Sequence, residues 1–98
     1  MILSSIIEQL ATSSHPVAKA LAKGEHFKVI AIGFKAGMVL KEHKTSLPAK
    51  LVVLQGSVAY QEGEMVKSLG QYDETAIPVN VPHSVTCTED ALCLLIQG

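Results

Sequence analysis

From Val17 to the end, the chain is a series of short apolar runs, each rich in Val, Ile, Leu or Ala and bounded by Gly, Pro, Asn or Asp. Runs of this kind are typical of β-strands, and no segment with helical periodicity separates them. The pattern predicts strands near residues 17–22, 26–34, 38–43, 49–55, 57–61, 64–69, 75–78, 83–88 and 91–97. Because so many short strands follow one another, we expect an all-β fold, a sandwich or barrel with antiparallel neighbours.

A short helix is predicted ahead of the strands. Ser5 is followed three residues later by Glu8, which is the spacing of a capping box at a helix start. Three apolar residues then fall on one face of the helix, namely Ile6, Ile7 and Leu10. We therefore expect one domain over residues 1–98, with a helix at 4–11 and a β-barrel at 17–97.

The chain carries few charges for a globular domain. Charged residues make up 17% of the sequence, against about 25% in an average domain. Runs such as 51–54 and 92–96 are apolar at successive positions, so both faces of these strands need cover. One face can point into a barrel. We expect the other face to be covered, either by a second subunit in a homodimer or by the amino-terminal helix.

The charge balance and the cysteines narrow the partners and the compartment. The net charge is −1 and all eight cations are lysines, whereas nucleic-acid binding favours clustered positive charge and arginine, so we expect no nucleic-acid partner. The longest charge-free stretch, 75–88, contains two prolines and is shorter than a span of about 20 residues, so we expect no membrane segment. No basic leader precedes the first apolar residues, and a cytoplasmic location is expected. Cys87 and Cys93 are expected to be reduced and partly buried.

The four histidines are the residues best suited to chemistry, because the chain lacks the common phosphate-loop, Cys-x-x-Cys and nucleophile-elbow motifs. His15 and His26 fall in turns, where a solvated loop position is the simpler interpretation. His43 ends one predicted strand and His83 opens another. Alternation predicts two faces, with Lys41, His43 and Thr45 on the first strand and His83, Val85 and Cys87 on the second.

The residues around the first of these histidines resemble the first motif of the cupin family, which are small jelly-roll barrels. Gly37 is followed after five residues by His43, and Gly56 closes the motif. Thr45 stands where the family has its second histidine, and Ala49 stands where it has a glutamate. The glycine and histidine spacing is therefore kept, while two polar positions are replaced.

The second cupin motif is similar to residues 70–87. Seven residues separate Gly70 from Pro78, and Asn80 stands in place of the motif's second glycine. Asparagine enters the left-handed backbone region with less strain than most side chains, so this exchange is tolerable. His83 is the motif histidine, and Cys87 replaces its asparagine. The resemblance implies a small single-domain cupin, an all-β jelly-roll barrel with a short amino-terminal helix and a depleted metal-ligand set.

In cupins the motif histidines and the glutamate hold one divalent metal inside the barrel. The resemblance therefore implies that His43 and His83 are metal ligands, holding Zn, Fe, Mn or Ni weakly. A catalytic zinc site usually has three protein ligands, and two of the four cupin ligands are replaced by Thr45 and Ala49. A conventional metal-dependent enzyme is for this reason not the first expectation. A set of His43, His83 and Cys87 binding zinc or copper stays open as an alternative.

Two functional interpretations follow from these residues, and a third concerns the surface. In the first, the barrel interior binds a small molecule between His43 and His83, and Lys41 near the mouth favours an anionic ligand. The pocket would be lined by Lys41, Thr45, Ala49, Leu51, Val53, Val85 and Cys87. In the second, His43 and His83 with water hold a divalent metal for dioxygenase or isomerase chemistry. In the third, the domain is an oligomerisation or regulatory module that acts through its surface.

Overall fold

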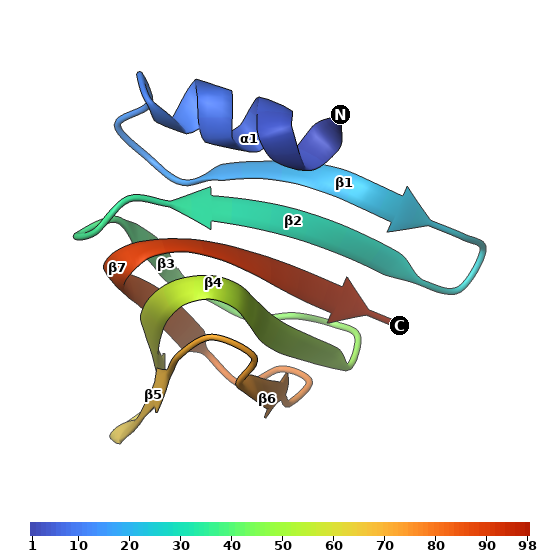
Figure 1. Ribbon diagram of the computed structural model, residues 1–98. Coiled ribbons are helices and arrows are strands. Elements are labelled where there is room, and N and C mark those ends of the chain that lie inside the picture. The colour runs from blue at the N-terminus through green and yellow to red at the C-terminus, as the bar shows by residue number, and fades with distance from the viewer.

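The computed structural model describes all residues, 1–98, as a β-barrel with one helix packed outside it (Figure 1). The all-β fold with a short amino-terminal helix is confirmed. The helix lies ahead of seven strands. In chain order the elements are α1 (Ile2–Leu10), β1 (Val17–Lys23), β2 (Lys28–Phe34), β3 (Val39–His43), β4 (Ala49–Glu62), β5 (Met65–Leu69), β6 (Glu74–Ile77) and β7 (His83–Gln97). No helix is long and apolar enough to cross a membrane.

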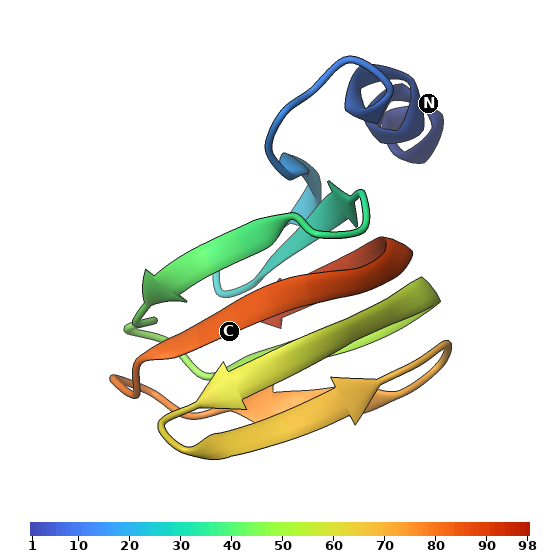
Figure 2. The same ribbon diagram turned by 90° about the vertical axis from the view of Figure 1, so that its left-hand side faces the viewer.

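Two long strands, β4 and β7, form the centre of the barrel. β4 has 14 residues and β7 has 15, and they pair antiparallel along most of their length. The carboxyl-terminal half of β7 pairs with β2, which pairs with β1, and the amino-terminal half of β7 pairs with β3. β6 pairs with the start of β4, and β5 pairs with its end. Because both long strands bend, the paired strands form two layers that face each other (Figure 2).

The bends correct the predicted strand count. The predicted strands 49–55 and 57–61 are one strand, and so are 83–88 and 91–97. Gly56 has a φ of +79°, and the β4–β7 register shifts around it. Irregular residues of this kind bend a strand and re-aim its side chains without ending the ladder. A glycine in the sequence therefore marked a corner of the barrel here, and not the end of a strand.

The main core lies between the two layers. Its members are the apolar residues of every second strand position, together with one buried tyrosine and both cysteines: Ile32, Phe34, Leu51, Val53, Val58, Tyr60, Leu69, Ile77, Val85, Cys87, Ala91 and Cys93. All are less than a tenth exposed. The two halves of β4 and β7 each contribute to this core, which ties the layers together by burial of apolar surface.

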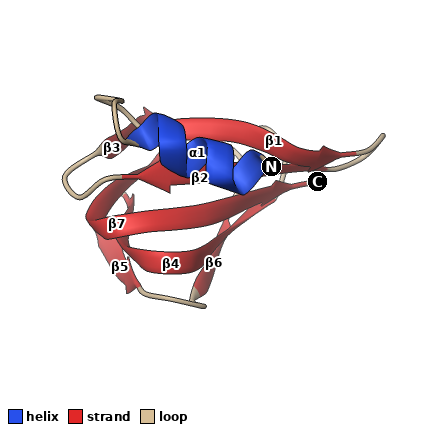
Figure 3. Cartoon of the chain, turned by 45° about the horizontal axis from the view of Figure 1, so that its top comes forward, coloured by secondary structure: helices blue, strands red, loops and turns tan.

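Helix α1 covers part of the outer face of the barrel (Figure 3). Ile6 and Leu10 are buried there against Val17, Ala31 and Leu92. Ile7, predicted for the same face, is 55% exposed and points away. The helix therefore covers part of the apolar outer face, as the low charge content of the sequence led us to expect.

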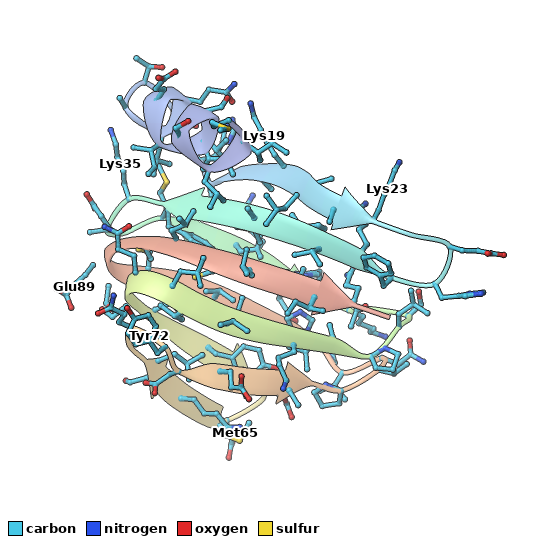
Figure 4. The ribbon with its side chains drawn as sticks, turned by 45° about the vertical axis from the view of Figure 1, so that its right-hand side comes forward. Lys19, Lys23, Lys35, Met65, Tyr72 and Glu89 are labelled. Atoms are coloured by element: carbon cyan, nitrogen blue, oxygen red, sulfur yellow. The ribbon has the colours of Figure 1, made fainter.

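The predicted capping box at Ser5 is wrong. The helix begins at Ile2, with Met1 as its N-cap and no side-chain hydrogen bond at the cap. Ser5 lies inside the helix, where its hydroxyl accepts a hydrogen bond of 2.7 Å from Lys19 Nζ. Figure 4 shows the Lys19 side chain beside α1. The Ser5 hydroxyl therefore bonds to a residue of β1, and it does not cap the helix as the sequence pattern predicted.

We predict that Gly56→Ala destabilises the protein by at least about 3 kcal/mol. A Cβ at Gly56 would overlap the backbone carbonyl of Asp90 on the paired strand, which cannot move without breaking the corner. Gly63→Ala is the matched control, because Gly63 also has a positive φ, of +60°, but has no atom near its Cβ position. The control should cost only about 1 kcal/mol, the usual strain of an L-residue in this region. Urea unfolding measures both, and equal losses would contradict the role of the corner.

Candidate functional site

The structure brings His43 and His83 together. His43 is the last residue of β3, His83 is the first residue of β7, and the two are cross-strand partners. Their ring centroids are 4.3 Å apart, and the ring planes are tilted by 58°. Both imidazoles line the same interior cavity. Residues 40 positions apart in the sequence thus form one site where β3 ends and β7 begins.

A bulge in β3 turns His43 toward the interior. The β3–β7 register shifts between Leu40 and His43, and both of these residues line the cavity although they are three positions apart. Strict alternation, which placed Lys41 and His43 on one face, is therefore wrong for this strand. Lys41 and Glu42 are both exposed, because the bulge leaves two residues outside between two inward ones.

Backbone carbonyls fix one nitrogen of each ring. His43 Nδ1 lies 2.8 Å from the carbonyl oxygen of Lys41, and His83 Nδ1 lies 3.0 Å from that of Val81. A carbonyl oxygen only accepts, so Nδ1 carries the proton in both rings. In a neutral imidazole the other nitrogen, Nε2, then has a free lone pair. Each histidine thus keeps Nε2 as its polar atom for a ligand.

The two histidines differ in exposure. His43 is exposed, whereas His83 is only 3% exposed. No buried side-chain nitrogen or oxygen in the protein lacks a hydrogen-bond partner, yet Nε2 of His83 makes no hydrogen bond. This nitrogen must therefore lie within the small part of His83 that solvent still reaches. Solvent therefore reaches the site from the side of His43, and His83 forms its buried inner end.

The cavity behind the pair is very small, about 10 Å³. Apart from the two histidines its walls are apolar, formed by Ile32, Phe34, Leu40, Leu51, Ile77, Val85 and Leu95. A cavity needs roughly 10–15 Å³ of this volume to hold one water molecule. The interior therefore has room for about one atom-sized ligand, and an organic molecule does not fit inside without movement of side chains.

Two of the predicted pocket residues line this cavity, Leu51 and Val85. Val53 is buried in the core but is not part of the cavity wall. Cys87 is also buried, and its thiol donates a hydrogen bond of 2.9 Å to the carbonyl oxygen of Glu89 near the barrel corner. Lys41 is exposed and lies outside the cavity lining.

The two positions that replace cupin ligands do not supply donors to the site. Thr45 is buried, and its hydroxyl donates a hydrogen bond of 2.9 Å to the carbonyl oxygen of Leu47 while accepting one of 3.3 Å from the Leu47 amide. Ala49 is half-buried and has no donor atom. The backbone carbonyl of Thr45 accepts a bond of 2.8 Å from the amide of Asn80, which joins the loops of the two motifs. Asn80 has a φ of 61°, which confirms the left-handed position expected from the motif.

The residues present do not fit a catalytic metal centre. No three of the His, Cys, Asp and Glu side chains lie close enough together to hold an ion. The alternative set of His43, His83 and Cys87 is therefore not assembled, because Cys87 lies toward the other end of its half-strand. Two imidazoles remain, fewer than the three protein ligands of a usual catalytic zinc or the two histidines and a carboxylate of a non-haem iron.

Tyr60 and Glu62 belong to this neighbourhood, and the sequence interpretation missed them. The Tyr60 ring lies 5.9 Å from that of His83 at an interplanar angle of 27°, and its hydroxyl donates a bond of 2.8 Å to Glu62 Oε2. Alternation within β4 could have placed these two on one face, since they are two residues apart. Only the pairing of β4 with β7 brings that face beside His83.

Several solved structures with this architecture are cupins. No protein-family model matches the sequence, and no curated protein matches it. The fold resembles a cupin superfamily protein from Desulfitobacterium hafniense, with a TM-score of 0.80, 18% identity, and 87% of this chain and 78% of that chain covered. An RmlC-like cupin from Desulfovibrio desulfuricans has a TM-score of 0.79 and 25% identity, with 86% and 82% covered. A cupin-like protein from Thermotoga maritima has a TM-score of 0.77 and 26% identity, with 84% and 67% covered.

These structural likenesses extend over most of each chain. In this chain the histidine pair lines the interior of the barrel. The chain is a small cupin in fold, a jelly-roll barrel with an added amino-terminal helix. The resemblance seen in the two sequence motifs is confirmed at the level of the fold.

The two cysteines should be inert in the folded protein. Burial, with a smaller contribution from nearby Cys87, raises the pKa of the Cys93 thiol to about 12, and burial followed by the charge of Asp90 raises the pKa of Cys87. We predict that iodoacetamide at about pH 8 modifies neither thiol until the protein is unfolded in urea, because the thiolate is the nucleophile. Rapid modification of the native protein would contradict this burial.

The raised pKa values also set a pH dependence. As pH rises above about 9, the unfolded chain loses its thiol protons while the folded chain keeps them, so the free energy of unfolding should fall between about pH 9 and pH 12. Cys93→Ala removes the Cys93 share of this slope, while the raised pKa of Tyr60 adds a further share above about pH 10. Below about pH 8 the thiols are protonated in both the folded and the unfolded chain, and they contribute no pH dependence there.

Proposed function

We propose that this cupin binds one small organic anion at the His43–His83 pair, without a catalytic metal. The observation that carries the proposal is that both Nδ1 atoms are held by backbone carbonyls, which leaves both Nε2 atoms for a ligand. A protonated imidazole keeps its Nδ1 bond and gains an Nε2–H, which can donate to a carboxylate oxygen. Two rings 4.3 Å apart can address the same small group.

The size of the cavity determines how such a ligand binds. Because the interior has room for about one atom-sized group, only one polar end of the ligand enters, and the remainder lies outside beside His43. Lys41, Glu42 and Lys44 lie around His43 in the sequence and are all exposed, so this segment carries one net positive charge. Charge of this sign raises the local concentration of anions.

Divalent metal binding is the second candidate, and one observation favours it. Histidines that bind metals usually donate their second ring nitrogen to a carbonyl or carboxylate, and both histidines here do so. His43 and His83 with water would hold Zn, Fe, Mn or Ni weakly, and enzyme chemistry of the dioxygenase or isomerase type would depend on that metal. The donor count argues against it, since two protein ligands make a weak site.

We expect acetate, used as the anion probe, to shift the ring signals of His43 and His83 in NMR titrations of the metal-free protein. His83→Ala should abolish the saturable response, whereas His15→Ala, a change at an exposed loop histidine, should leave it unchanged. Elemental analysis of the purified protein and titration with Zn²⁺ form the second arm. Stoichiometric metal that is lost in His43→Ala, with no response to acetate, would replace the anion proposal by the metal one.

A second copy of the chain is the partner that we propose for the outer face of the barrel. Around the area that α1 covers, this face carries apolar side chains that are half-buried or exposed: Val29, Val52, Leu54, Leu94 and Ile96. Leu54 and Leu94 also pack against the α1 cluster, at the border of the covered area. They come from β2, β4 and β7, which lie side by side (Figure 1). An apolar area this continuous is typical of an interface, and a homodimer covers the same patch on both copies.

We predict that Ile96→Lys converts the protein from a dimer to a monomer in sedimentation at micromolar concentration, because Ile96 is 38% exposed and packs in neither core cluster of the monomer. The wild type should sediment at twice the 10.4 kDa chain mass, because burial of this face removes apolar surface from water. Val66→Lys is the control, since Val66 is 57% exposed on β5, away from the proposed face. A wild type that is monomeric under these conditions rules out the dimer.

The partners that we propose are therefore a small molecule and a second copy of the chain. We propose no nucleic-acid partner, on the ground that every one of its eight cations is a lysine. We propose a cytoplasmic location because both cysteines are free and buried, as is usual in a reducing compartment.

A further inference from the structure

His83 is held between two rings that come from the strands on either side of it. His43 on β3 has its ring centroid 4.3 Å away, and Tyr60 on β4 has its centroid 5.9 Å away with its plane nearly parallel. β3 and β4 both pair with the first half of β7, one on each side (Figure 2). The Tyr60 ring therefore limits how far the His83 ring can turn from the side opposite His43.

Glu62 fixes Tyr60 in turn. Tyr60 is completely buried, and its hydroxyl has one hydrogen-bond partner, Glu62 Oε2, at 2.8 Å. Burial, together with the hydrogen bond and the negative charge of Glu62, raises the pKa of Tyr60 well above its usual range. The phenol thus stays protonated and donates to Glu62 throughout the physiological pH range.

Glu62 and His83 lie at the same end of the β4–β7 ladder, each one residue beyond its last pair. Gln61 pairs with Ser84 at the end of the β4–β7 ladder, so the following residue of β4 and the preceding residue of β7 are Glu62 and His83. Both belong to the inward-facing set, because residues two apart on a strand share a face and the inward residues here are Tyr60 and Val85. A carboxylate therefore ends the same inner row that contains the two imidazoles.

Packing alone does not require this pair. A phenylalanine would fill the core position of Tyr60 with the same ring, and no acid would then be needed at the half-buried end of β4. The hydroxyl and the carboxylate form a polar contact beside the one place in the barrel where an imidazole nitrogen is free. The location of the contact, and not its strength, is what suggests a role.

We propose that Tyr60 and Glu62 are positioning residues for His83. Glu62 holds the Tyr60 hydroxyl, and the Tyr60 ring backs the His83 imidazole so that Nε2 faces the open side of the site. The inference rests on the proposed function, because it concerns the histidine that meets the ligand. Neither residue needs to touch the ligand.

The test is NMR of the histidine rings in the ligand-free protein, in which ring ¹⁵N shifts report the tautomer and the surroundings of each imidazole. Tyr60→Phe and Glu62→Leu should each shift the His83 ring signals while leaving His15 and His26 unchanged. Glu62→Gln keeps an acceptor for the phenol and should restore the wild-type signals. The double variant should shift no further than either single one, as expected of residues that act through one contact.

Glu64→Leu is the matched control, because Glu64 is an exposed acid two residues further along the chain. The proposal is overturned if Tyr60→Phe and Glu62→Leu change the His83 signals no more than this control does, even if they lower the urea midpoint, since that result describes packing only. Tyr60→Phe keeps the test decisive if Glu62→Leu fails to fold, because it removes the same hydrogen bond from the other partner. Acetate titration of the same samples separates the two proposals: an absent acetate response in the wild type contradicts the anion site and leaves the ring shifts interpretable.

Discussion

The antiparallel pairing of β4 with β7 is the constraint on which the rest of the structure depends. Each strand runs through both layers of the barrel, so this one ladder joins the layers, carries the corner at Gly56 and supplies eight of the twelve residues of the main core. Shorter strands then add to its edges. Because every inward side chain of the two strands is set by this register, a one-residue slip would turn the core face outward.

The histidine site is a consequence of where that ladder ends. β7 begins at His83, β3 ends opposite it at His43, and β4 ends beside it at Glu62. Strand ends have few ladder bonds, so side chains there remain reachable while their backbones are still held. Apolar side chains fill the barrel behind the pair and leave a cavity of about 10 Å³. The barrel therefore positions two imidazoles but does not enclose a ligand.

The sequence was informative at different levels in different parts of the chain. Turn-forming residues and apolar runs predicted strands correctly, and the motif spacing singled out His43 and His83, because both depend on local chemistry and fixed intervals. The same local signals failed at Gly56, where a turn former lies inside a strand, and at Ser5, whose hydroxyl bonds to Lys19 on another element. Tyr60 and Glu62 gave no signal, since their importance comes from a neighbouring strand.

The sequence by itself determined that the chain forms a small all-β barrel with one outer helix, because strand periodicity and turn chemistry act over a few residues. It also showed Thr45 and Ala49 at the positions where the cupin motif that the chain resembles has a histidine and a glutamate, which is a matter of residue identity. Only the tertiary structure decided that the interior is filled, that a bulge turns His43 inward, and that Tyr60 backs His83. These depend on how side chains from distant strands share one space, and pairing register and volume are properties of the assembled barrel.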